Sequence, residues 1–86
     1  MTPSIIIYSS SHCPYCVRAK ELLTRKGVSF TEILIDKDEK KREEMIAKTK
    51  RYTVPQIFIN EQHIGGFDEL YALEKSGKLK ELLEEG

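Results

Sequence analysis

Cys13 and Cys16 are the residues of this chain whose type and spacing could carry chemistry. They are its only cysteines and stand two residues apart in the segment CPYC. A disulfide between them would close a loop of about four residues and add roughly 2 kcal/mol of stability, so a structural staple explains the pair poorly. A structural zinc site needs four ligands, whereas this segment supplies two, and His12 is awkwardly placed to share the metal. The spacing therefore favours thiol–disulfide exchange.

The residue between the cysteines that matters most for this reaction is Pro14. Proline prefers the first position of a helix, so Pro14 predicts a helix with Cys13 at its N-cap. The unpaired N–H groups of the first turn and the helix dipole both favour a thiolate at that point. Cys16 falls on the apolar side of the same turn, where it should be less exposed. We therefore expect Cys13 to attack a disulfide and Cys16 to resolve the mixed disulfide.

The apolar pattern predicts strands and helices in alternation around this segment. Strands are expected at 4–8, 28–35, 56–59 and 62–65, and helices at 14–26, after Asp38 and after Gly66, with a last helical turn or two beyond Gly77. The order β-α-β-α-β-β-α places a parallel βαβ unit before an antiparallel hairpin. The expected fold is therefore of the α/β class, with a four-stranded mixed sheet that carries helices on both faces.

Length and charge exclude several classes of protein. The chain has 86 residues, which is enough for one domain, and its formal net charge is zero with a pI of about 6.7. It therefore lacks the basic excess that attracts nucleic acid or anionic lipid. Its N-terminal apolar run, residues 5–8, is too short for a signal peptide or a membrane span. A cytoplasmic location is the expectation that follows.

Three segments in this order resemble the glutaredoxin family. They are CPYC at 13–16, TVPQIFI at 53–59 and GGFDEL at 65–70, and the similarity extends over nearly the whole chain. It is greatest to the small dithiol bacterial type. Thioredoxins are less similar, because their motif is CGPC preceded by a tryptophan and this chain has no tryptophan. The resemblance implies a thioredoxin fold, in agreement with the strand order, and a monomer that exchanges thiols and disulfides with glutathione.

The resemblance also implies a glutathione-binding site. The family's proline in TVP is cis, so the Val54–Pro55 bond should be cis and leave the Val54 backbone groups free to pair with the cysteine part of glutathione. The backbone of Phe67 and Asp68 would bind the γ-glutamyl carboxylate at a helix N-terminus, with the Asp68 side chain as N-cap. Arg51 resembles the family's cationic residue that binds the glycine carboxylate of glutathione. The implied binding residues are Tyr15, Arg51, Thr53, Val54, Pro55, Gly66, Phe67 and Asp68.

One position departs from the family pattern. Many glutaredoxins carry a lysine three residues before the nucleophile, and this chain has Ser10 there. The missing cation is expected to affect the affinity for glutathione and the acidity of Cys13, but not the reaction. Tyr15 would flank the sulfur and shield the mixed disulfide. Neither His12 nor His63 is needed for the mechanism, and both are expected at the surface.

The implied reaction uses glutathione as co-substrate and no tightly bound cofactor or metal. Cys13 would attack a protein–glutathione mixed disulfide at the glutathione sulfur, whereas protein disulfides would need Cys13 and Cys16 together. The implied partners are glutathionylated or disulfide-bearing proteins and, indirectly, glutathione reductase. Two alternatives remain open: an iron–sulfur carrier in which two chains and two glutathiones share a cluster through Cys13, and a thioredoxin-like disulfide reductase served by a flavoprotein.

Overall fold

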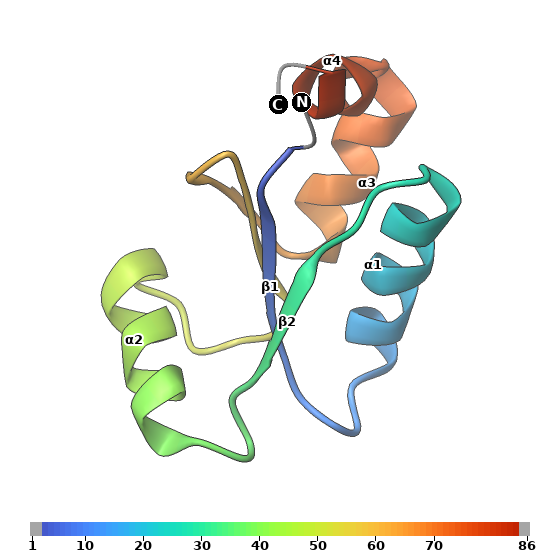
Figure 1. Cartoon of the computed structure of the whole chain (residues 1–86). Helices are drawn as coiled ribbons and strands as arrows, with labels where there is room; N and C mark the ends of the chain where they lie inside the picture. The colour runs from blue at the N-terminus through green and yellow to red at the C-terminus, as the bar shows by residue number, and fades with distance from the viewer. Residues whose placement is uncertain (1–2, 85–86) are drawn as a thin grey trace.

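The computed structural model describes residues 3–84, and its elements follow the predicted order with one helix more (Figure 1). The elements are β1 (Ile5–Ser9), α1 (Pro14–Arg25), β2 (Thr31–Leu34), α2 (Glu39–Thr49), β3 (Gln56–Ile59), β4 (Gln62–Gly65), α3 (Phe67–Ser76) and α4 (Lys78–Glu84). No helix within this described part of the chain is both long enough and apolar enough to cross a bilayer.

The four strands form one mixed sheet in the order β2-β1-β3-β4. Strand β1 runs parallel to β2 and antiparallel to β3, and β3 and β4 form an antiparallel hairpin. Asn60 and Glu61 make the turn of this hairpin with positive φ angles of 51° and 70°, which is the backbone that a two-residue hairpin turn requires. The predicted parallel unit followed by a hairpin is confirmed, and with it the thioredoxin fold.

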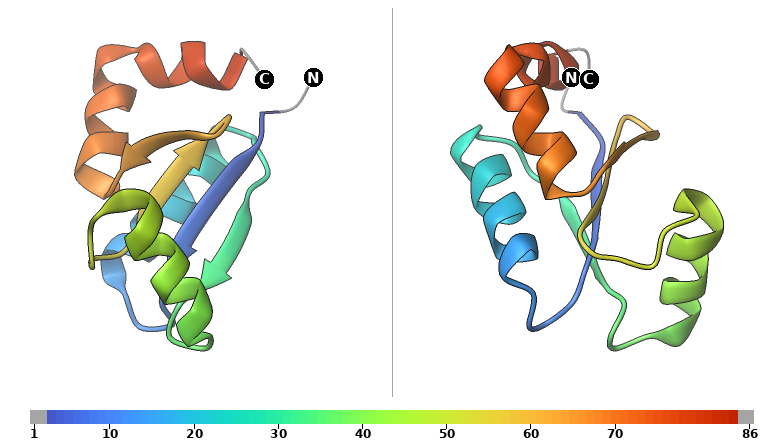
Figure 2. Two further views of the ribbon diagram at one scale, coloured as in Figure 1. Left: turned by 90° about the vertical axis from the view of Figure 1, so that its left-hand side faces the viewer. Right: turned by 180° about the vertical axis from the view of Figure 1, so that it is seen from behind.

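Helices cover both faces of the sheet, as expected. Helices α1 and α3 lie side by side on one face, and α2 lies on the other (Figures 1 and 2). Alternate side chains of β1 point to opposite faces of the sheet. Ile7 packs in the core cluster on the side of α1 and α3, whereas Tyr8 packs with Met45 of α2 on the other side. Because both faces of β1 are buried, the strand reads as a continuous apolar run in the sequence.

The structure differs from the expected elements at two places. Strand β2 begins at Thr31, because pairing with β1 starts there, whereas Val28 and Phe30 pack against the core without joining the ladder. The last helical turns form a separate helix, α4, because Gly77 ends α3 with a φ of +82°, a conformation that favours glycine. Leu79 of α4 is fully buried in the same core cluster as Ile7 and Leu70.

Candidate active site

Cys13 occupies the N-cap of α1, as the position of Pro14 predicts. Its sulfur accepts a hydrogen bond from the backbone N–H of Cys16 at 3.2 Å. The same sulfur lies 3.7 Å from the carbonyl oxygen of Val54, to which its thiol donates. Both cysteines are free thiols. The sulfur of Cys13 is partly exposed and contacts a loop 41 residues away in the sequence, so the start of α1 and the segment before β3 meet at this thiol.

Cys16 lies behind Cys13 and is fully buried. Burial raises the pKa of the Cys16 thiol to about 12, and its hydrogen bond with Cys13 acts in the same direction. A hydrogen bond from the backbone of Ser10 and the charge of Lys20 oppose this rise. Because the thiolate is the attacking form, a buried thiol with a high pKa is a poor first nucleophile. The arrangement is that of a partly exposed thiol at a helix N-terminus with a buried, protonated thiol behind it.

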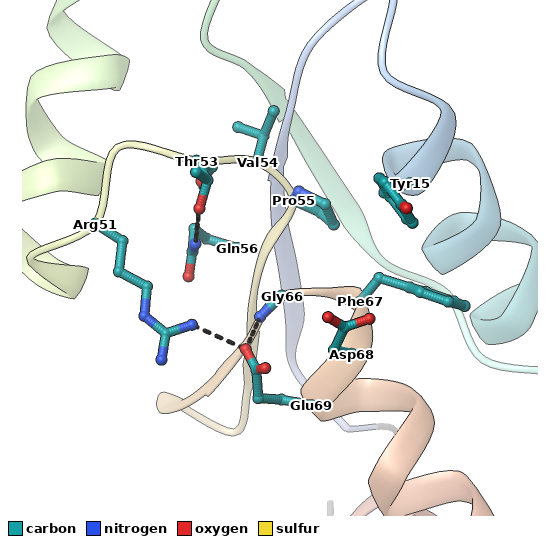
Figure 3. Close-up of a pocket in the computed structure, with 10 residues that line it drawn as sticks. All are labelled: Tyr15, Arg51, Thr53, Val54, Pro55, Gln56, Gly66, Phe67, Asp68 and Glu69. Carbon is teal, nitrogen blue, oxygen red and sulfur yellow. Dashed lines mark hydrogen bonds and ion pairs between the residues drawn. The ribbon is translucent and has the colours of Figure 1, made fainter.

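A cavity of about 260 Å³ is lined in part by Val54, the residue whose carbonyl oxygen accepts from the Cys13 thiol (Figure 3). It is bounded by the start of α1, the segment before β3 and the start of α3. Its lining contains all eight residues that the sequence implied for binding, together with two that it did not: Tyr15, Arg51, Thr53, Val54, Pro55, Gly66, Phe67, Asp68, Gln56 and Glu69. Ser10 is not in this lining. The structure therefore brings residues from three distant segments to one surface next to Cys13.

The segment before β3 forms one wall of the cavity. The Val54–Pro55 bond is cis, as expected. The Val54 carbonyl is not free, however, because it accepts the hydrogen bond from the Cys13 thiol. A thiolate cannot donate this bond, so the carbonyl becomes available when Cys13 loses its proton. On the opposite wall the Tyr15 side chain is 53% exposed and its ring lies 6.2 Å from that of Phe67.

The start of α3 forms the floor of the cavity, and here one prediction is wrong. The N-cap of α3 is Gly66 and not Asp68, which lies in the first helical turn. The reason is that Gly66 has extended backbone angles and Phe67 already has helical ones. Phe67 and Asp68 therefore carry two of the first-turn N–H groups that have no partner within a helix. The Asp68 carboxylate also lines the cavity (Figure 3).

Glu69 is a cavity residue that the sequence analysis missed. Its Oε1 accepts a hydrogen bond from the backbone N–H of Gly66 at 2.7 Å. The same oxygen forms an ion pair with Arg51 Nη1 at 2.8 Å. The hydrogen bond from the Gly66 backbone lowers the pKa of the Glu69 carboxyl most, and the hydrogen bond from Arg51 lowers it further. A glutamate three residues after an N-cap is the spacing of a capping box, so the sequence did contain a signal for this contact.

Gln56 is the second residue that the sequence analysis missed. Its side chain is buried, and its Nε2 donates to the carbonyl oxygen of Thr53 at 3.0 Å. Its Oε1 lies 2.8 Å from Nε2 of His63. Gln56 thus ties the wall of the cavity to β4. Within residues 3–84, no group of three or more His, Cys, Asp or Glu side chains is arranged to hold a metal ion.

Comparison with known proteins gives a consistent result. The glutaredoxin family model matches residues 5–64. The chain is 59% identical over 80 residues to Glutaredoxin 3 of Escherichia coli strain K12, which covers 93% of this chain and 96% of that protein. Its fold matches the crystal structure of wheat glutaredoxin with a TM-score of 0.89 at 41% identity, covering 95% of this chain and 80% of that one. It also matches the crystal structure of the buckwheat glutaredoxin–glutathione complex with a TM-score of 0.90 at 30% identity, covering 96% and 78%.

Proposed function

The chain belongs to the glutaredoxin family of thiol–disulfide oxidoreductases, and we propose that it uses glutathione to reduce protein–glutathione mixed disulfides and protein disulfides. The observation that carries the proposal is the position of Cys13. Its partly exposed sulfur touches Val54, a wall residue of a cavity that has the Arg51 guanidinium on one side and the N-terminus of α3 on another.

Glutathione presents chemical groups that match these three features. It has two carboxylates and one sulfur, and the cavity offers two places that favour carboxylates. The N–H groups of Phe67 and Asp68 at the start of α3 suit one of them, because a helix N-terminus favours an anion. The Arg51 guanidinium suits the other. A related structure, the buckwheat glutaredoxin–glutathione complex, supports glutathione as the ligand.

Reduction of a mixed disulfide needs one cysteine of the enzyme. The Cys13 thiolate attacks the glutathione sulfur, the disulfide bond breaks, and the substrate protein leaves as a thiolate that takes a proton from water. The Cys13 sulfur is then bonded to glutathione. A second glutathione, as thiolate, attacks that adduct at the glutathione sulfur and releases Cys13 and oxidised glutathione. One reduced glutathione is consumed for each mixed disulfide.

Reduction of a protein disulfide needs both cysteines. Cys13 attacks one sulfur of the substrate and forms a mixed disulfide, and the second substrate sulfur leaves and is protonated. Cys16 then loses its proton and attacks the Cys13 sulfur, which releases the substrate as a dithiol and leaves a Cys13–Cys16 disulfide. Two glutathiones supply the two electrons that reduce this disulfide. A reducing compartment such as the cytoplasm suits this cycle, because glutathione is kept reduced there.

The decisive test is a coupled assay with a glutathionylated peptide, glutathione, glutathione reductase and its nicotinamide cofactor. We expect oxidation of the cofactor that depends on both the protein and glutathione. A parallel assay replaces glutathione and its reductase with thioredoxin reductase. Activity in the second assay alone would contradict the proposal and favour a thioredoxin-like reductase. Visible absorbance after anaerobic purification, without activity in either assay, would favour the iron–sulfur carrier.

A further inference from the structure

A single carboxylate oxygen joins two sides of the candidate glutathione cavity. Oε1 of Glu69 lies 2.8 Å from Nη1 of Arg51 and 2.7 Å from the backbone nitrogen of Gly66 (Figure 3). We propose that Glu69 is a positioning residue, which holds the Arg51 guanidinium at a fixed distance from the N-terminus of α3. This inference rests on the proposed function, because it assigns Glu69 a role in how that site recognises the two carboxylates of glutathione.

Arg51 needs such a partner because of where it lies. It stands in the segment between α2 and β3, and its side chain is 48% exposed. An arginine side chain on a loop loses considerable rotamer entropy when a ligand orders it. Glu69 orders the guanidinium before the ligand arrives. The guanidinium has five N–H groups, and Glu69 engages one nitrogen, so donors remain for a second carboxylate.

The backbone around Glu69 is shaped to let its carboxylate fold back. Gly65 precedes the N-cap with a φ of +124°, and a Cβ placed there would lie 2.3 Å from Oε1 of Glu69. Any larger residue would therefore push the carboxylate away from both of its partners. Glycine at this position leaves space for the carboxylate between β4 and α3. The hydrogen bond from Gly66 and the ion pair with Arg51 both end on Oε1 of Glu69, so both contacts depend on the glycine at position 65.

The charge of Glu69 opposes the ligand to some extent. Its lowered pKa keeps the carboxyl ionised, and an ionised carboxylate repels the carboxylate that Arg51 is to bind. The side chains of both Arg51 and Glu69 are almost half exposed, so water and salt screen this repulsion. Salt also weakens the Arg51–Glu69 ion pair, but the hydrogen bond within it, at 2.8 Å, remains to order the guanidinium. We therefore expect the net effect of Glu69 at physiological salt to favour binding.

The test is a double-mutant cycle on ligand affinity. The variants are Glu69→Gln, Arg51→Ala and the double substitution, and the probe is S-methylglutathione, a thioether that cannot exchange with Cys13. Glutamine retains an oxygen that can accept the Gly66 N–H, but it loses the ion pair with Arg51. The matched control is Glu43→Gln, an exposed position on α2 on the other face of the sheet. Nuclear magnetic resonance titration of the reduced protein gives the dissociation constant.

If Glu69 acts through Arg51, Glu69→Gln weakens binding about two- to fivefold, the range expected for an exposed ion pair. The same substitution has no effect when Arg51 is already alanine, and Glu43→Gln has no effect in either background. The loss appears in the Michaelis constant for glutathione, with turnover unchanged. S-Methylglutathione with its glycine carboxylate converted to an amide binds wild type and Glu69→Gln equally, because Arg51 has no carboxylate to hold.

Three outcomes would overturn the inference. Equal losses from Glu69→Gln with and without Arg51 would make Glu69 a cap of α3 alone. Tighter binding by Glu69→Gln would make it a competitor of the ligand. A loss of affinity for the amide as large as that for the acid would show damage to the whole site. These outcomes leave the proposed function intact, whereas wild-type protein that neither binds S-methylglutathione nor reduces a glutathionylated peptide would refute both.

Discussion

The backbone N–H of Cys16 donates a hydrogen bond to the sulfur of Cys13 across 3.2 Å. One turn of helix therefore contains both the sulfur that we propose as the nucleophile and the thiol that lies behind it. This contact holds the Cys13 sulfur at the N-cap of α1. The side chain of Cys16 is buried below the same turn and cannot meet a large substrate first. We therefore propose different roles for the two cysteines, which substitution should separate.

Cys13→Ser should abolish transfer from both mixed disulfides and protein disulfides. Within residues 3–84, no other thiol lies at a helix N-terminus, and Cys16 is buried with a pKa of about 12. Serine is itself a good N-cap, so the fold should persist. The measurement is the coupled glutathione assay, with the melting temperature as control. Substantial activity in a folded Cys13→Ser protein would assign the nucleophile to another residue.

Cys16→Ser should separate the two activities. Removal of glutathione from a glutathionylated peptide needs only Cys13 and external glutathione, so its rate should be close to that of wild type. Reduction of a protein disulfide should slow, because no internal thiol resolves the mixed disulfide. Both assays use the same protein preparation, and the mixed disulfide should accumulate and be visible by mass spectrometry. Equal loss of both activities would show that Cys16 also supports the first attack.

The resolving step should accelerate as the pH rises. Burial is the largest cause of the raised pKa of Cys16, and it persists when the Cys13 sulfur is bonded to a substrate, whereas the contributions of the Cys13 thiol do not. Attack requires the thiolate. Well below that pKa the thiolate fraction rises about tenfold for each pH unit, so the rate of release from a Cys13 mixed disulfide should do the same from about pH 6 to pH 9. Rapid-mixing measurements of a preformed mixed disulfide test this dependence. A rate that is flat over this range would mean that the Cys16 proton is removed by a group inside the protein.

Much of this architecture could be predicted because local patterns decide it. Asn60 and Glu61 form a polar pair between two short apolar runs, and the hairpin forms where it was expected. Pro14 predicts the N-cap at Cys13 in the same way. By contrast, β2 is shorter than its apolar run because Val28 and Phe30 are buried by packing instead of pairing, and hydrophobicity alone does not distinguish the two.

The parts of the candidate site that could not be predicted depend on contacts between distant segments. Glu69 stands at the capping-box spacing from Gly66, but that signal can be used only once Gly66 is known to be the N-cap, and the sequence analysis placed the N-cap at Asp68. The capping contact of Glu69 depends on the extended backbone of Gly66 and on the presence of Arg51, which is 18 residues away in the chain. The contact between Cys13 and Val54 joins residues 41 apart and could not be found from spacing.

Gly65→Ala should destabilise the protein and displace Glu69. The new Cβ would lie 2.3 Å from Oε1 of Glu69 in a backbone with φ of +124°. We expect a loss of about 1–3 kcal/mol in the free energy of unfolding, measured by urea denaturation. Gly77→Ala is the matched control, since Gly77 also has a positive φ but nothing lies within 4 Å of its added Cβ. Equal losses in the two variants would mean that the contact with Glu69 adds nothing beyond backbone strain.

The last prediction concerns acid stability and Glu32. Its Oε2 lies 2.6 Å from Lys20 Nζ and accepts a hydrogen bond from Ser9 Oγ at the same distance, and these contacts lower the pKa of the carboxyl. A carboxyl whose pKa is lower in the folded protein than in the unfolded chain stabilises the fold fully above the unfolded pKa of about 4.3, and this stabilisation is lost as the pH falls through the folded pKa.

Glu32→Gln mimics the protonated carboxyl, and its side-chain oxygen can still accept a hydrogen bond from Ser9. The difference in unfolding free energy between wild type and Glu32→Gln should therefore be constant at neutral pH and shrink below about pH 4.3. Denaturation curves across this range measure it, and a difference that grew in acid would show that the contacts do not favour the ionised form.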